Sequence, residues 1–197
     1  MQYVSIDIET TGLNHHIHDI VEVGAVMDDL KVQKPLSELP KFHCYIVQDN
    51  YRVDPYCAFL HQAIFHRISR RNNAEMRTKY KFYTQEEFIP AFRAWLIESG
   101  AEKSSNGNVR ITPAGKNFGS FDKLFLDSQF NFSNEFSVVH RQLDPAILYF
   151  DHLNDDVLPN QQTCLDRAGI EGTVEHTGLE DAIQVVQLLR HKFPLTS

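Results

Sequence analysis

The first part of the chain carries three short apolar stretches separated by polar segments. Residues 3–9 alternate apolar and polar side chains, as expected for a strand with one buried face. Residues 20–27 form a second apolar run that one glutamate interrupts, and Asp28 and Asp29 are expected to begin the turn beyond it. Residues 42–47 are a weaker third candidate. Three strands in close succession predict an antiparallel meander at the start of a sheet.

Helical periodicity follows this region. Two helices are expected over residues 55–69 and 84–99, and Phe59 and Ala63 share one face of the first. The second helix has a capping box and an apolar stripe, formed by Thr84 with Glu87 and by Phe88, Phe92, Trp95 and Leu96. We interpret this aromatic stripe as core and not as a surface for stacking bases.

The second half of the chain alternates short strands with helices. A polar loop at residues 100–108 separates the two halves. Strands are expected at residues 109–114 and 138–143, and helices at 121–130, from Asp144 and Pro145 onward, at 160–169 and at 178–192. The last helix has an expected capping box of Thr177 and Glu180 and a buried stripe of Leu179, Ile183, Val186 and Leu189. This order predicts an α/β fold, a mixed sheet flanked by helices, as a single domain over residues 1–197.

Two carboxylates on the first predicted strand require a physical explanation. Asp7 and Glu9 are two residues apart, so their side chains lie on the same face, while Ile6 and Ile8 lie on the opposite face. Like charges at the edge of a core repel each other and lose hydration. A cation between them removes this cost, and a hard divalent metal ion is the natural candidate for oxygen ligands.

Composition and charge place the chain among ordinary globular proteins. It has 197 residues, of which 42% are hydrophobic and 23% charged. No apolar run approaches the roughly 20 residues that span a bilayer, and no signal peptide is visible. The three cysteines, Cys44, Cys57 and Cys164, form no metal-ligand pair or disulfide framework, which suits a reducing cytoplasm.

The charge is negative overall but unevenly distributed. With 19 basic and 26 acidic residues the formal charge is -7, which argues against coating of long nucleic acid. Residues 66–81 nevertheless contain six basic side chains and only one acidic one: Arg67, Arg70, Arg71, Arg77, Lys79 and Lys81, with Glu75. This segment is either a solvated loop or a rim that contacts phosphates.

Two later motifs add further acidic residues. Residues 113–122 pass from a strand through a glycine turn into a helix, with Asp122 at the start of that helix. His176 precedes the last helix, and Asp181 lies on its first turn. Taken separately, each aspartate fits a favourable interaction with a helix macrodipole, and His176 fits an ordinary loop histidine.

The order of these motifs along the chain is more informative than each alone. An Asp-x-Glu-Thr-Thr-Gly-Leu segment, a Phe-Asp pair opening a middle helix, and a His-x4-Asp segment opening the last helix resemble the DEDDh, or DnaQ-like, 3′–5′ exonucleases. The resemblance extends from about Tyr3 to Lys192. The family members that this chain resembles in size and layout are oligoribonuclease, ribonuclease T and the proofreading exonuclease subunit. It implies a ribonuclease-H-like sheet.

The resemblance also implies roles for individual residues. Asp7, Glu9, Asp122 and Asp181 would bind two Mg²⁺ or Mn²⁺ ions, and His176 would act as the general base. Two ions about 3.5–4 Å apart stabilise both the attacking and the leaving oxygen in phosphodiester hydrolysis. The absence of paired cysteine or histidine ligands disfavours a structural zinc site.

Recognition of a chain end requires further contacts. The backbone of Thr10, Thr11 and Gly12 is expected to approach the terminal nucleotide, because glycine adds no bulk. By the resemblance, Leu13 would wedge against the last bases, although core packing is an equal alternative. Further substrate-binding candidates are Arg70 and Arg71, and Phe118 and Phe121, which could stack on a base, although core packing is the better explanation for at least one of the two rings.

Some questions stay open at this level. The substrate is expected to be single-stranded RNA, DNA or a short oligonucleotide; the alternatives are a small-nucleotide phosphodiesterase and an idle nucleic-acid-binding domain. No motif separates RNA from DNA. The related enzymes are often homodimers, but no interface is visible in the sequence. His15, His16 and His18 fit a surface loop better than a metal site.

Overall fold

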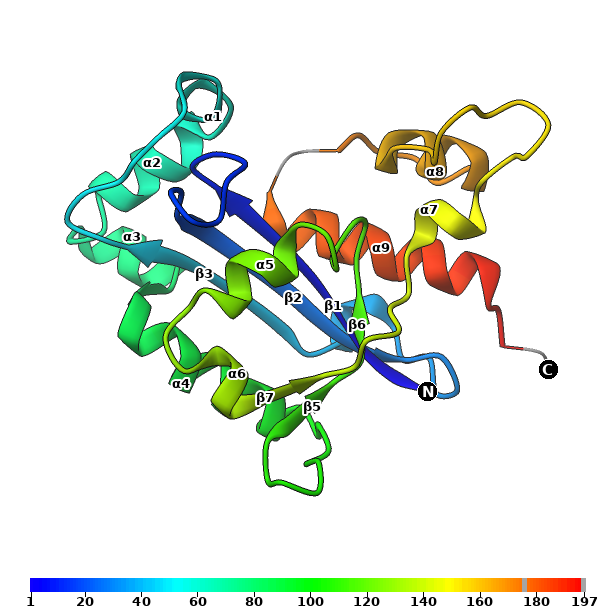
Figure 1. The fold of residues 1–197 in the computed structure, drawn as a ribbon, viewed down its shortest axis with the longest axis horizontal. Coiled ribbons are helices and arrows are strands. Elements are labelled where there is room, and N and C mark those ends of the chain that lie inside the picture. Colours follow the sequence, from blue (N-terminus) through cyan, green and yellow to red (C-terminus); the bar gives the residue numbers. More distant parts are fainter. Residues whose placement is uncertain (175–176, 196–197) are drawn as a thin grey trace.

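The structure is a computed structural model that describes residues 1–174 and 177–195. Among these residues, a five-stranded sheet has the spatial order β4-β3-β2-β1-β6 (Figure 1). Its strands are β1 (Gln2–Thr10), β2 (Ile20–Asp29), β3 (Lys41–Val47), β4 (Phe82–Thr84) and β6 (Pro113–Ala114). A separate pair consists of β5 (Val109–Ile111) and β7 (Phe136–Val138).

The helices surround these strands (Figure 1). In the described part of the chain they are η1 (Leu36–Glu38), α1 (Pro55–Leu60), α2 (Gln62–Ser69), α3 (Ala74–Lys79), α4 (Gln85–Glu98), α5 (Asp122–Asp127), α6 (Phe132–Glu135), α7 (Pro145–Leu148), α8 (Gln161–Ala168) and α9 (Gly178–Lys192).

The sheet is mixed, as the sequence predicts. β1, β2 and β3 form an antiparallel meander, in which Glu9 lies opposite Glu22 and Glu22 opposite Tyr45. The outer strands β4 and β6 then add in parallel to β3 and β1. Because β1 and β3 run in the same direction, their carboxyl ends lie at one end of the sheet.

The two faces of β1 pack against different helices. Ile6 and Ile8 belong to a core that contains Phe88 and Phe92 of α4. Tyr3, on the opposite face, packs in a second core built largely from α9. Asp7 and Glu9 share the Tyr3 face by strand alternation, so the predicted acidic pair lies on the side of the sheet that α9 covers.

Several predicted helix ends are confirmed. Thr84 and Glu87 form both hydrogen bonds of a capping box at the start of α4. The Asp144 carboxylate accepts a hydrogen bond from the Ala146 N–H, and the Asn160 side chain accepts one from the Thr163 N–H. Gly169 ends α8 with φ of 65°, in the left-handed region that favours glycine.

The predicted helix over residues 55–69 is instead two helices that meet at His61. Phe59 and Ala63 are exposed, and the buried positions of α2 are Ile64 and Ile68. The interruption has a tertiary cause, because the His61 side chain turns inward and contacts a carboxylate of β1.

Three other element boundaries also differ from prediction. Residues 109–114 divide at Thr112 between two sheets, since β5 pairs with β7 and β6 pairs with β1. The expected helix over residues 121–130 is only α5. Of the strand expected at residues 138–143, only Val138 belongs to β7, and Leu143 makes an isolated bridge.

Predictions for two polar segments are corrected by the structure. Asp28 belongs to β2, where it is buried between the Tyr3 hydroxyl and the Arg190 guanidinium. Asp29, the last residue of β2, does begin the predicted turn, because its carbonyl accepts from the Val32 N–H and its carboxylate from the Lys31 N–H. At the start of α9, the Thr177 side chain makes no capping hydrogen bond, so the capping box with Glu180 is not formed.

Candidate active site

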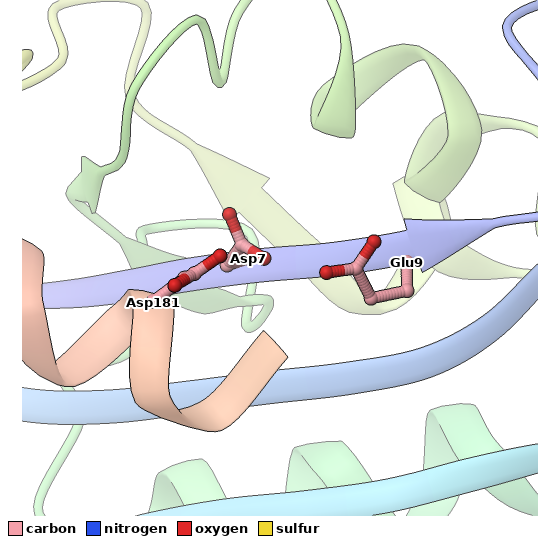
Figure 2. Close-up of side chains that lie close together, drawn as sticks. All are labelled: Asp7, Glu9 and Asp181. Carbon is pink, nitrogen blue, oxygen red and sulfur yellow. The ribbon is translucent and has the colours of Figure 1, made fainter. Parts of the chain in front are cut away.

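Three of the predicted acidic residues meet where β1 passes the start of α9. Asp7 and Glu9 come from β1 and Asp181 from the first turn of α9. One carboxylate oxygen from each lies within 4.8 Å of the other two. Figure 2 shows the Asp7 and Asp181 carboxylates beside each other, with the Glu9 carboxylate extending toward them along β1. Residues 174 positions apart in sequence thus contribute to one oxygen-rich site.

The fourth predicted carboxylate lines the same cavity. Asp122 is the first residue of α5 and is buried, and its Oδ1 accepts a hydrogen bond of 3.1 Å from the Ile8 N–H. The cavity has a volume of about 390 Å³, and its lining includes Asp7, Glu9, Asp122, Asp181, Phe121 and Lys116. The structure therefore brings all four predicted carboxylates to one opening, together with a lysine that the sequence did not single out.

Burial and mutual repulsion act strongly on these carboxylates. Burial, with neighbouring Glu22, Asp181 and Asp122, raises the pKa of Glu9 to about 8. Burial raises the pKa of Asp122 to about 7, and that of Asp7 also lies well above its usual range because of burial and the nearby carboxylates. Bound cations offset such repulsion, so the donor set fits divalent ions with oxygen ligands.

Two glycines bring α9 close enough to complete this site. A Cβ atom on Gly24 of β2 would lie 2.1 Å from the Gly178 carbonyl carbon. A Cβ on Gly178 would lie 2.9 Å from the Asp7 carbonyl oxygen. No side chain fits between these backbones, so the first turn of α9 lies directly on β1 and β2.

Glu22 is a site residue whose role the sequence did not reveal. Its side chain is fully buried, and its Oε2 accepts a hydrogen bond of 3.3 Å from the Gly178 N–H. Its Oε1 lies 2.6 Å from His43 Nε2. The signal was present, since this glutamate interrupts an apolar strand, but its partners come from α9 and β3.

His61 is a second residue that sequence reasoning missed. It is 4% exposed, and its Nε2 lies 3.4 Å from Glu9 Oε2. In the sequence it looks like one polar position of an amphipathic helix. Only the break between α1 and α2 turns it toward the carboxylates.

The predicted end-recognition segment lies directly after Glu9. The Thr10 hydroxyl donates to the Gly12 carbonyl, and the Thr11 hydroxyl accepts from the Asp19 N–H. Both residues are buried, and the Thr11 N–H and carbonyl form hydrogen bonds with Asp19 and Asp54, so this part of the loop is held in place by the protein itself. Leu13 is 78% exposed, so the alternative of core packing is wrong for it.

The histidines of this loop support its shape. A Cβ on Gly12 would lie 2.5 Å from the His18 ring, so Gly12 leaves space for that ring. His18 Nδ1 accepts a hydrogen bond from the Asn14 N–H, and His15 contacts the Phe125 ring. These contacts agree with the prediction of a loop.

One predicted substrate contact is corrected by the structure. Phe118 is 1% exposed and packs in the core with Ile6 and Ile8, so it offers no ring face to a base. Phe121 lines the acidic cavity instead. Arg70 and Arg71 follow the end of α2. His176, the predicted general base, lies outside the described residues.

Comparison with known families decides the class of protein. A family model described as an exonuclease, of the RNase T type, matches residues 4–189. The chain belongs to the RNase T exonuclease family. This confirms the family and the enzyme class that the motifs predicted, and the family depends on divalent metal ions. No curated protein sequence matches the chain.

Solved structures show that the exonuclease fold is shared. E. coli Exonuclease I in complex with a dT13 oligonucleotide carrying a 5cy group aligns with a TM-score of 0.62 and 12% identity, over 95% of this chain and 39% of that chain. The nuclease domain of 3′hExo, a DEDDh family member bound to rAMP, aligns with a TM-score of 0.60 and 16% identity, over 95% of this chain and 89% of that chain. The exonuclease chain described here thus spans well under half the length of Exonuclease I.

Within residues 1–174 and 177–195, no helix of this exonuclease combines the length and the hydrophobicity that crossing a bilayer requires.

Proposed function

We propose that this exonuclease removes nucleotides from the 3′ end of single-stranded RNA or DNA and releases nucleoside 5′-monophosphates. The observation that carries the proposal is the convergence of Asp7, Glu9 and Asp181, with Asp122 in the same cavity. Asp122 and Asp181 are buried and Asp7 and Glu9 are half-buried, and the raised pKa values of Asp7, Glu9 and Asp122 support a donor set suited to two Mg²⁺ or Mn²⁺ ions.

The site residues have different roles in hydrolysis: metal binding, proton transfer and substrate contact. Asp7, Glu9, Asp122 and Asp181 would hold the ions, which when bound neutralise phosphate charge and lower the pKa of water. His176, by the sequence resemblance, takes the proton from the attacking water. The exposed Leu13 contacts the terminal nucleotide, and the buried residues 10–12 hold the loop that presents it, which explains attack at a chain end.

A pair of matched variants tests this function. Asp7→Asn removes one of the four carboxylates that would hold the ions and should abolish Mg²⁺-dependent cleavage of a 3′-labelled oligonucleotide. Asp156→Asn makes the same chemical change at an exposed position and should leave cleavage unchanged. Magnesium-dependent cleavage by Asp7→Asn at the rate of the unaltered protein would contradict the proposal.

The general base is tested separately. His176→Ala should lower turnover by roughly 10²–10⁴-fold while Mn²⁺ binding, followed by calorimetry, survives. A variant with unchanged turnover contradicts the assignment.

Two further experiments address the oligomeric state and the substrate. Sedimentation of the unaltered protein tests the homodimer expected from related enzymes. Cleavage rates on matched RNA and DNA oligonucleotides identify the preferred sugar.

A further inference from the structure

A basic groove lies at the edge of the sheet, away from the acidic cavity. Its volume is about 410 Å³, and it is lined by side chains of α3, of β4 and of the turn that follows α2. The residues that define the basic groove are Arg71, Asn72, Arg77, Tyr80, Lys81 and Tyr83. Figure 1 shows α2 and α3, in cyan, beside β3.

The cations of the basic groove have no acidic partner. Within the described part of the chain, Arg71, Arg77 and Lys81 make no ion pair with a carboxylate. The carboxylate that does line the groove, Glu87, accepts the Thr84 N–H and is occupied in a helix cap. Positive charge therefore faces solvent here in a protein whose net charge is -7.

The groove is shaped by ordered side chains and not by a free loop. The Arg77 guanidinium donates to the Arg71 carbonyl and to the Asn72 side chain, at 3.1 and 3.4 Å. Arg67 stacks over the rings of Tyr45 and Tyr80 and donates to the Tyr45 hydroxyl. Preorganised cations lose less entropy when they bind an anion.

The strand register fixes where the basic groove lies relative to the site. Glu9, Glu22, Tyr45 and Phe82 form one row across β1, β2, β3 and β4. Three strand spacings of about 4.8 Å put Phe82 about 14 Å from Glu9. β4 runs parallel to β3, so the groove lies at the same end of the sheet as the acidic cavity.

Helix α2 gives an independent estimate of this separation. His61, before its first residue, contacts Glu9, and Arg71 follows its end. At 1.5 Å per residue, the step from His61 to Arg71 covers about 15 Å. Arg67 lies between the two. By this estimate too, the basic groove lies about 15 Å from the acidic cavity.

We propose that the basic groove binds backbone phosphates of a single-stranded polynucleotide, several nucleotides upstream of the bond that is cleaved. This rests on the proposed function. A repeating phosphate backbone supplies anions at both places, whereas a dinucleotide cannot span a separation of about 14 Å and occupies only the acidic cavity. The substrate class is thus an oligonucleotide longer than a few nucleotides, and not a small nucleotide.

The proposal predicts a length-dependent defect. For Arg77→Gln/Lys81→Gln, the ratio of kcat/KM on an oligonucleotide of roughly 10 nucleotides to that on a dinucleotide should fall about 10-fold. In binding titrations with EDTA, the slope of log K against log salt should decrease by about 1.4, since each lost single-strand phosphate contact contributes about 0.7.

Two control variants separate charge from folding. Arg77→Lys/Lys81→Arg keeps both charges and should keep the length ratio. Lys31→Gln/Lys34→Gln removes two exposed charges beyond the far end of β2 and should keep both the ratio and the salt slope.

The proposal is overturned if Arg77→Gln/Lys81→Gln leaves the kcat/KM length ratio and the salt slope unchanged. It is also overturned if Lys31→Gln/Lys34→Gln lowers the ratio and the slope equally. Displacement of the oligonucleotide by an acidic peptide of equal charge would likewise contradict it. If the unaltered protein hydrolyses no oligonucleotide, the proposed function fails, while the salt-dependent binding still tests the basic groove.

Discussion

Gly24 of β2 and Gly178 of α9 are in direct backbone contact, and neither position has room for a Cβ atom. The added atom on Gly24 would lie 2.1 Å from both the Gly178 carbonyl carbon and the Leu179 nitrogen. This contact sets the height of α9 above the sheet. It thereby sets the distance from Asp181, on the first turn of α9, to Asp7 on β1.

The first prediction concerns this contact. Gly24→Ala forces α9 away from the sheet and should lower the free energy of unfolding by about 3 kcal/mol or more, at the upper end of overpacking costs. It should also weaken Mn²⁺ binding, because Asp181 moves with α9. Chemical denaturation and calorimetry measure the two effects.

Gly107→Ala serves as the control for this variant. Gly107 has φ of 87° and open space around it, so alanine there adds backbone strain of about 1–2 kcal/mol without a clash. If Gly24→Ala binds Mn²⁺ as tightly as Gly107→Ala does, the glycine contact does not position the site.

The second prediction concerns Glu22. Glu22→Ala leaves the buried Gly178 N–H without its acceptor, which should cost about 1–3 kcal/mol of stability and lower kcat. Glu22→Gln keeps an oxygen acceptor at this place and should recover most of the stability. Thermal melts and initial rates of the two variants check this, and equal behaviour of alanine and glutamine would contradict a hydrogen-bonding role.

The third prediction is a pH dependence of the metal-free protein. The folded-state pKa values are about 8 for Glu9 and about 7 for Asp122, above their ordinary values of 4.5 and 3.8. The folded state thus holds protons that the unfolded chain releases. Their stabilising contribution is complete below these ordinary values and is lost as the pH rises toward about 8.

Melting temperatures in EDTA from about pH 5 to about pH 8.5 test this window. They should fall with pH, and saturating Mg²⁺ should reduce the fall. Glu9→Gln should also flatten the curve. Asp155, whose pKa Arg167 lowers to about 2, titrates below the window and does not obscure it. A melting temperature that rises with pH in EDTA is incompatible with the prediction.

The fourth prediction concerns Leu13, which is 78% exposed beside the site. Leu13→Ala should change stability by less than about 0.5 kcal/mol and raise KM for a single-stranded oligonucleotide several-fold. Val32→Ala makes a similar truncation at a residue 62% exposed beyond the other end of the sheet, and should leave KM unchanged. A similar KM for both variants would show that Leu13 does not contact substrate.

The sequence by itself determined the elements whose signals are local. The alternation of Asp7 and Glu9 with Ile6 and Ile8 gave both the strand and its two faces. The capping box of Thr84 and Glu87 gave the start of α4. The order of the acidic motifs gave the exonuclease family, because each motif needs only its neighbours in the chain to be recognised.

Tertiary structure alone decided the features that depend on distant partners. The break at His61, the burial of Asp28 in β2 and the position of Phe118 in the core each follow from residues far away in sequence. Glu22 was visible as a glutamate in an apolar strand, but its contacts with Gly178 and His43 exist only after the sheet and α9 have packed. Local patterns fix side-chain periodicity, whereas the approach of two backbones depends on packing, and that approach completes the acidic cavity.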